Sequence, residues 1–205
     1  MKNYTSILVI PLMASCVQAQ ADSSAAIIEQ LSNNNNAQIT QMISMNDSST
    51  LKQVGDFNSI ISEQRESLQG AIMITQVGDN NFVSAVQFSM SANNVANSNV
   101  AIGSQQGDGN MFFISQTDSF NSATINQQVE MNQATTIHAG MFNSSVTNQI
   151  GTSNIGTTIQ SGVSHLASVS QTGDINMYTV SQGLQVRQTA VINQLGSNQS
   201  AIILQ

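Results

Sequence analysis

The sequence predicts an all-β protein in which two sheets wind into a solenoid, and three observations lead to this prediction. Glutamine returns every eleven or twelve residues over most of the chain, from Gln30 to Gln205. Between the glutamines, apolar and polar residues alternate with a period of two, which indicates strands with two different faces. Glycine often follows two residues after the glutamine. Self-similarity at a fixed period is typical of a repeat protein whose units stack on one another.

The strand-final position of the repeat is the most regular one. Fifteen of the sixteen positions are glutamine, and His138 fills the remaining one between Gln127 and Gln149. The glutamines are Gln30, Gln41, Gln53, Gln64, Gln76, Gln87, Gln105, Gln116, Gln127, Gln149, Gln160, Gln171, Gln182, Gln194 and Gln205.

Asparagine marks the start of the same unit, six residues before the glutamine, and gives the pattern Asn-x-h-x-h-x-Gln with h usually apolar. The asparagines are Asn35, Asn58, Asn81, Asn99, Asn110, Asn121, Asn132, Asn143, Asn154 and Asn176. No h position is charged, so we expect the face that carries Asn, both h positions and Gln to be buried, because an unpaired buried charge is very costly. Sixteen strands are predicted, at 24–30, 35–41, 47–53, 58–64, 70–76, 81–87, 99–105, 110–116, 121–127, 132–138, 143–149, 154–160, 165–171, 176–182, 188–194 and 199–205.

The segments between the strands have the composition of tight turns. Glycine provides the positive φ that a tight reversal needs, at Gly55, Gly78, Gly107, Gly140, Gly151, Gly162, Gly173 and Gly196. Aspartate often follows it, at Asp56, Asp79, Asp108 and Asp174. Other turns lack the glycine and have Ile43, Glu66, Asp118 or Val129 in its place. Residues 88–98 interrupt the period, and we interpret them as a looped-out insertion.

Identical residues at identical positions favour a solenoid over a meander of hairpins. In a solenoid each residue lies about 4.8 Å from its counterpart in the next rung, where a rung is one full turn of two strands. We expect buried Asn and Gln amides to bond to the amides above and below them in a structural ladder, which satisfies most of their donors and acceptors. Two strands per rung give about eight rungs.

The composition excludes several classes of partner. Only 7% of residues are charged and the net charge is −7, with four Lys and Arg in total. Nucleic-acid binding needs a basic patch, and this chain has none. An anionic membrane surface is disfavoured for the same reason. A Gln- and Asn-rich chain of high β-propensity and low charge is instead typical of self-associating β structure.

The N-terminus has the pattern of an export signal. Lys2 is followed by an apolar run and a small-residue cleavage site at 17–19, so we expect a signal peptide at 1–19 and a mature solenoid at 20–205. The single cysteine, Cys16, lies within the signal, and lipidation of Cys16 is an open alternative to cleavage after Ala19. No segment of the mature chain is long and apolar enough to span a bilayer.

Residues for catalysis are scattered, so we expect no catalytic, cofactor-binding or metal site and no enzyme activity. A narrow solenoid has no room for a pocket of convergent polar groups. The turn aspartates favour solvated turns, with weak cation binding by a stacked row as the alternative. His138 and His165 replace ladder amides and are expected to be structural, although protonation within the ladder would disfavour stacking.

The turn-plus-strand unit Gln-x-Gly-x-x-Asn-x-(small)-x-x-x-Gln resembles the curlin repeat of bacterial curli fibres. Residues 53–64, 76–87, 149–160 and 171–182 match it, and the resemblance extends over about 24–205. It implies a curlin-type β-solenoid subunit that is secreted and polymerises into extracellular amyloid fibres for adhesion and biofilm matrix. Its partners would be further copies or another curlin-type subunit, together with dedicated secretion proteins.

Three functions remain open at this stage. The chain is either a fibre-forming subunit or a minor, nucleating subunit, and the irregular positions at His138, His165 and 88–98 favour the second. A monomeric binding solenoid, such as an ice or glycan binder, is the remaining alternative. It needs a regular outward array of threonines, and we expect no continuous rank from the outward threonines at 40, 50, 75, 124, 135, 157, 179 and 189.

Overall fold

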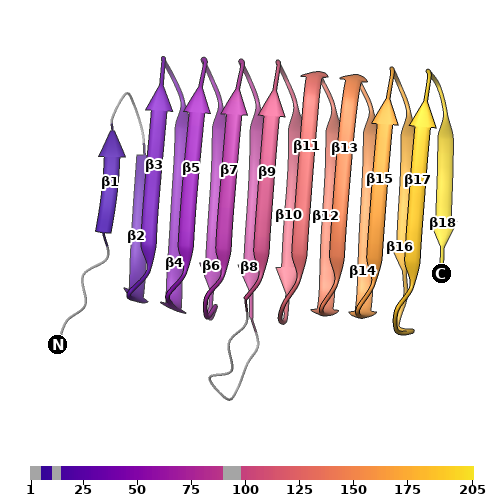
Figure 1. Ribbon diagram of the computed structural model, residues 1–205. Coiled ribbons are helices and arrows are strands. Elements are labelled where there is room, and N and C mark those ends of the chain that lie inside the picture. The colour runs from indigo at the N-terminus through magenta and orange to yellow at the C-terminus, as the bar shows by residue number, and fades with distance from the viewer. Residues whose placement is uncertain (1–5, 11–14, 90–97) are drawn as a thin grey trace.

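The computed structural model describes residues 6–10, 15–89 and 98–205, and it describes side chains for 23–89 and 98–205. All regular elements in these ranges are β-strands, arranged as two nine-stranded parallel sheets. The chain alternates between the sheets, so that consecutive strands face each other and every second strand is a hydrogen-bonded neighbour (Figure 1). The predicted two-sheet β-solenoid is confirmed.

Sheet A contains the odd-numbered strands and sheet B the even-numbered strands. Sheet A comprises β1 (Ser6–Ile10), β3 (Ala25–Leu31), β5 (Ser48–Val54), β7 (Ala71–Val77), β9 (Val100–Gln106), β11 (Ser122–Glu130), β13 (Ser144–Thr152), β15 (Leu166–Thr172) and β17 (Thr189–Leu195). Sheet B comprises β2 (Ser15–Asp22), β4 (Asn36–Met45), β6 (Ser59–Arg65), β8 (Phe82–Phe88), β10 (Met111–Thr117), β12 (Gln133–Met141), β14 (Ile155–Val163), β16 (Met177–Gln182) and β18 (Ser200–Leu204).

The strand bounds differ from the predicted ones at both ends. Most strands extend one to four residues past the glutamine position, as β4 does to Met45 and β11 to Glu130. Each strand from β3 onward begins one residue later, after the asparagine position, because that residue forms hydrogen bonds within the turn. Phe88 lies in β8 rather than in the insertion, and the part of the insertion at 90–97 falls outside the described residues. The strands β1 and β2 lie largely within the segment predicted as a signal peptide.

The four repeated positions of each unit form the buried face, as their alternation predicted. In β8 the burial pattern alternates at every residue, and Asn81, Val83, Ala85 and Gln87 are all at most 1% exposed. Neighbouring strands are in register, so Gln87 of β8 lies beside Gln64 of β6 and Gln116 of β10. A shift by a single residue would expose the whole apolar set, which is why the pattern fixes the register.

The core is narrow and balances large against small residues across the two sheets. The Phe112 ring fills the space opposite Gly103, where an added Cβ would lie 1.9 Å from the ring. Within sheet B, the Tyr178 ring of β16 covers Gly156, its register partner on β14, and an added Cβ on Gly156 would lie 1.9 Å from the ring. Glycine is required at both positions because the interior is close-packed.

Two apolar clusters make up the core, one ending at Ala134 and the other beginning at Ala167. The interval between them is a polar seam, which we define as the buried residues Thr136, His138, Ser145, Thr147 and Thr158. The solenoid is therefore continuous in its backbone but interrupted in its hydrophobic core.

The turns require left-handed backbone at the position two residues after the glutamine. The eight predicted turn glycines all have positive φ, between 106° and 133°. A Cβ on Gly78 would lie 2.3 Å from the carbonyl oxygen of Gly107 in the next turn, so close stacking of the turns also selects glycine. Five non-glycine residues at this position, Ser32, Ile43, Glu66, Asp118 and Val129, also have positive φ, at a cost of about 1–2 kcal/mol each.

Candidate functional site: the glutamine ladders

The buried glutamines of each sheet form a continuous chain of side-chain amide hydrogen bonds. In sheet A, eight glutamines from Gln30 to Gln194 are joined by seven Nε2–Oε1 bonds of 2.7–2.9 Å. In sheet B, Gln41 to Gln116 and Gln160 to Gln205 form two shorter chains with bonds of 2.8–3.0 Å. In every case Nε2 donates toward the C-terminal rung, so the ladders are polar.

The second hydrogen of each glutamine amide joins the two sheets. Gln127 Nε2, on β11, donates to the Met111 carbonyl at the start of β10, at 2.9 Å. Gln149 Nε2, on β13, makes the equivalent bond to the Gln133 carbonyl of β12, also at 2.9 Å. One amide therefore holds its own sheet along the solenoid axis and the opposite sheet across the core. Apolar residues of similar size cannot do either.

The asparagines form the expected amide-to-amide bonds in only one short run, where Asn132 Nδ2 donates to Asn110 Oδ1 at 3.1 Å and Asn154 Nδ2 donates to Asn132 Oδ1 at 3.0 Å. Their recurring bonds are instead to backbone groups. Asn58 Oδ1 accepts from the backbone N–H of Asn81 in the next rung at 3.0 Å, and Asn58 Nδ2 donates to the Gly78 carbonyl at 2.7 Å. The same pair of bonds recurs at Asn81, Asn110, Asn121, Asn132, Asn143, Asn154 and Asn176. The asparagines therefore satisfy the backbone of the stacked turns.

His165 occupies an asparagine position, and its imidazole ring reproduces the bond to the backbone N–H of the next rung, while its other nitrogen faces a carbonyl of its own turn. Its Nδ1 accepts from the backbone N–H of Gln188 at 3.2 Å, as an asparagine Oδ1 would. Its Nε2 lies 3.3 Å from the Ser161 carbonyl oxygen and donates to it in that tautomer. The substitution therefore leaves the stacking of the turns intact.

His138, in contrast, interrupts the ladder of sheet B within the polar seam. Its Nε2 is 2.9 Å from Ser145 Oγ, while its Nδ1 has no hydrogen-bond partner. Gln160 Oε1, next in the ladder, and Thr136 Oγ1 also lack partners. Burial without a charged neighbour lowers the pKa of His138 from 6.5 to about 3, so the ring is neutral at pH 7.

Asp47 is a buried titratable residue that the sequence analysis did not single out, although it occupies an asparagine position. Its Oδ1 accepts from the Gly70 backbone N–H at 2.7 Å. Desolvation raises the pKa of Asp47 from 3.8 to about 6, opposed by the Gly70 bond and by the nearby Ser67 and Ser44 hydroxyls. Those hydroxyls and Asp47 Oδ2 do not reach good hydrogen-bond geometry, so we interpret their effect as proximity rather than as formed bonds.

The turn aspartates form a row along one edge, which we call the aspartate edge and define by Asp56, Asp79, Asp108 and Asp174. Asp79 Oδ1 accepts from the Asp56 N–H, and Asp108 Oδ1 accepts from the Asp79 N–H, both at 2.7 Å. One carboxylate oxygen of each is thus used in a bond between stacked turns. No group of three or more His, Cys, Asp or Glu in the described residues is placed to hold a metal ion.

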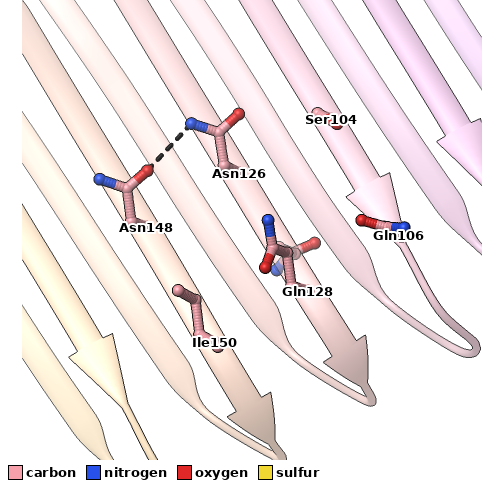
Figure 2. A pocket seen from close by; sticks show the side chains of 7 residues that line it. Ser104, Gln106, Asn126, Gln128, Asn148 and Ile150 are labelled. Atoms are coloured by element: carbon pink, nitrogen blue, oxygen red, sulfur yellow. Dashed lines mark hydrogen bonds between the residues drawn. The ribbon is translucent and has the colours of Figure 1, made fainter. Parts of the chain in front are cut away.

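The outer face of sheet A carries a shallow groove lined by amides, with a volume of about 170 Å³ (Figure 2). Its lining includes Ser104, Gln106, Gln128 and Ile150, together with Asn126 and Asn148, whose amides bond to each other at 2.9 Å. The groove is open and holds no titratable group among its lining residues. It has the features of a hydrated polar surface rather than of a catalytic pocket.

The outer face of sheet B corrects the expectation that the threonines form no rank. Thr135, Thr157 and Thr179 lie in register on β12, β14 and β16. The rank ends after three residues, between Phe113 and Ile202. No helix within the described ranges has the length and apolarity needed to cross a membrane.

The fold and the ladders together define a structural repeat protein, in which stacking of like side chains holds the molecule together. Comparison with known families agrees with this class. The family described as the curlin associated repeat matches residues 151–183, which run from the turn before β14 to the end of β16. This match confirms the resemblance to curlin repeats, and the chain fits a curlin-type structural protein. No curated protein sequence matches the chain.

Replacement of one ladder glutamine tests its contribution to stability. Gln127→Leu leaves Gln105 Nε2 without an acceptor and Gln149 Oε1 without a donor, so we expect a loss of about 3 kcal/mol in the free energy of unfolding. Gln128→Leu, at the adjacent exposed position, is the matched control and should change it by less than about 0.5 kcal/mol. Denaturant titration of both variants measures the difference, and equal effects would show that the ladder bonds contribute nothing.

His138→Gln should restore the sheet B ladder between Gln116 and Gln160. The folded-state pKa of His138 lies below its unfolded value, so the parent chain has full stability above pH 6.5 and loses it as pH falls toward 3. Between pH 6.5 and 4 this loss amounts to roughly 3 kcal/mol. The variant should not lose stability over this pH range, and it should be more stable than the parent chain at pH 7. Unfolding midpoints of both chains across pH measure these differences. If the stability of the variant falls with pH as steeply as that of the parent chain, protonation of His138 is not the cause of the loss.

Asp47→Asn should have the opposite dependence on pH. The folded-state pKa of Asp47 lies above its unfolded value, so in the parent chain stability present below pH 3.8 is lost as pH rises through about 6. An amide keeps the acceptor for the Gly70 N–H and removes the buried charge. We expect a gain on the order of 2 kcal/mol at pH 7 and none at pH 3. A variant no more stable than the parent at pH 7 would contradict a buried, ionised Asp47.

Proposed function

We propose that this chain is a structural subunit of extracellular curli-like amyloid fibres and that it assembles by end-to-end stacking of strands, without catalytic activity. One observation carries the proposal: the ladders have unused bonding groups of opposite kind at the two ends. Gln30 and Gln41 have Oε1 atoms that accept no hydrogen bond. Gln194 and Gln205 each donate one Nε2 hydrogen to a backbone carbonyl, Met177 and Thr189 respectively, and within the described residues neither donates its other hydrogen to a glutamine.

Removal of the predicted signal peptide would prepare the N-terminal end for stacking. The strands β1 and β2 pair with β3 and β4. Cleavage after Ala19 takes away β1 and most of β2 and leaves the edges of β3 and β4 without neighbours. Exposed strand edges are templates for the strands of another chain. The ladder glutamines and turn glycines then serve as the structural residues of both the subunit and the joint between subunits.

The curlin resemblance supports the remaining parts of the proposal. It favours secretion to the cell surface, with curlin-type secretion proteins as partners and with adhesion and biofilm matrix as the roles of the fibre. The acidic turns, with a net charge of −7 for the chain, would limit association before export is complete.

A minor, nucleating subunit is the alternative, and the polar seam favours it. The seam divides the hydrophobic core and places unpaired Thr136, His138 and Gln160 atoms inside the solenoid. A subunit with such a defect is less suited to form the bulk of a fibre than to present one regular end to another subunit.

Fibre formation by the purified mature chain, residues 20–205, tests the leading proposal. We expect thioflavin-positive, protease-resistant fibres, and we expect the full-length chain to elongate more slowly because β1 and β2 cover the acceptor end. Gln41→Leu should lengthen the lag of the mature chain, while the exposed Gln128→Leu should not. A mature chain that stays folded and monomeric for days contradicts the proposal and favours a monomeric binding solenoid.

Seeding distinguishes the fibre-forming role from the nucleating one. A nucleator in substoichiometric amount should abolish the lag of a related curlin-type subunit while forming few fibres alone. Efficient fibre formation without a partner, at the same concentration, assigns the chain to the fibre-forming role.

A further inference from the structure

The outer surfaces of the solenoid differ in a way that the stacking of rungs does not explain. Sheet B has no Asp, Glu, Lys or Arg in any of its six strands from β8 to β18. The charged residues on the outer faces lie near the N-terminal end as two ion pairs, Lys52–Glu29 on sheet A and Arg65–Glu63 on sheet B. The other charges in this part of the chain lie in or next to turns, at the edges.

Aromatic and aliphatic side chains gather on this uncharged part of sheet B. We call the outward residues Phe82, Val86, Phe88, Met111, Phe113 and Ile137 the phenylalanine face. Phe82 lies in register with Met111 on the neighbouring strand, and Ile137 continues to Ile159 of β14. Phe82 and Phe88 are at opposite ends of β8, so the face extends about 20 Å along the strands.

Sheet A presents a different outer surface at the same level along the solenoid axis. Its outward positions on β9, β11 and β13 include Gln106, Gln128 and the hydrogen-bonded amides Asn126 and Asn148 (Figure 2). Amides of this kind are costly to remove from water unless a partner replaces each hydrogen bond. The outward positions of β8, β10 and β12 carry mainly rings, aliphatic groups and hydroxyls, with Gln133 as the exposed amide at the start of β12. Removing this surface from water therefore costs less than removing the amides of sheet A.

We propose that the phenylalanine face is a lateral interface, on which a second copy of the chain lays the same face of its own sheet B. A second solenoid is the occupant whose side chains repeat at the same spacing of about 4.8 Å, so that rows of side chains can interdigitate along several rungs as in a dry interface between paired sheets. The same surface on both copies makes the contact isologous.

The area and the charges fit this occupant. The phenylalanine face covers three strands at about 4.8 Å and seven residues at about 3.3 Å, which gives roughly 330 Å² per copy, well below the roughly 800 Å² per partner of a standard stable interface. A single pair is therefore weak, and pairing gains strength with each subunit stacked along the axis. The acidic turns remain at the edges of the sheets. Their repulsion opposes edge-to-edge contacts between two solenoids but not the face-to-face contact between the two copies of sheet B.

The inference rests on the proposed function, because a stacked fibre repeats the phenylalanine face in every subunit.

The test is the mass per unit length of fibres grown from the mature chain and from two matched variants. Phe113→Lys places a charge in the phenylalanine face. Ile102→Lys places it at the same position of the repeat on the preceding strand, β9, where Ile102 is 39% exposed on sheet A. We expect paired fibres for the unmodified chain and for Ile102→Lys, and half that mass per length for Phe113→Lys.

Phe113→Thr provides a second variant that adds no charge and continues the threonine rank of Thr135, Thr157 and Thr179. It should also shift fibres toward the single form while keeping the thioflavin signal. Fibres of single mass from the unmodified chain, or a halving by Ile102→Lys alone, overturn the lateral interface and leave the fibre proposal standing. Absence of fibres from the unmodified chain overturns both.

Discussion

The carboxamide of each buried glutamine bonds in two directions at once, and the rest of the solenoid depends on this. One hydrogen reaches the next glutamine of the same sheet, and the other reaches a backbone carbonyl of the opposite sheet, as at Gln127. The spacing of strands within a sheet matches the reach of an amide-to-amide bond. The ladder can therefore continue through any number of rungs, and each added rung satisfies the one before it.

Two of the buried titratable residues mark positions where this scheme is broken. Asp47 and His138 each occupy an amide position, and burial moves their pKa values in opposite directions. Their contributions to stability therefore change with pH in opposite senses over the acidic range, Asp47 in the N-terminal third of the solenoid and His138 on β12.

Charged and uncharged side chains occupy different parts of the surface, with most charges at the edges and few on the outer faces of the strands. Acidic residues lie in the turns, which must remain hydrated, and the strand faces beyond β6 carry almost no charge. In the proposed fibre, every added rung would extend the uncharged faces. Stacking along the axis and pairing across the faces are thus separate properties, set by inward and outward side chains respectively.

The sequence alone determined the repeat, the buried face and the register, because a period of two with amides at fixed positions allows only one set of residues to point inward. It also determined where glycine is needed. It did not determine the bonds of the asparagines, since residue type does not show that Asn58 pairs with turn backbone rather than with another amide. Nor did it reveal the rank of Thr135, Thr157 and Thr179 or the phenylalanine face. Consecutive segments lie in opposite sheets, so neighbours in space are every second segment in sequence, and only the tertiary structure brings those side chains together.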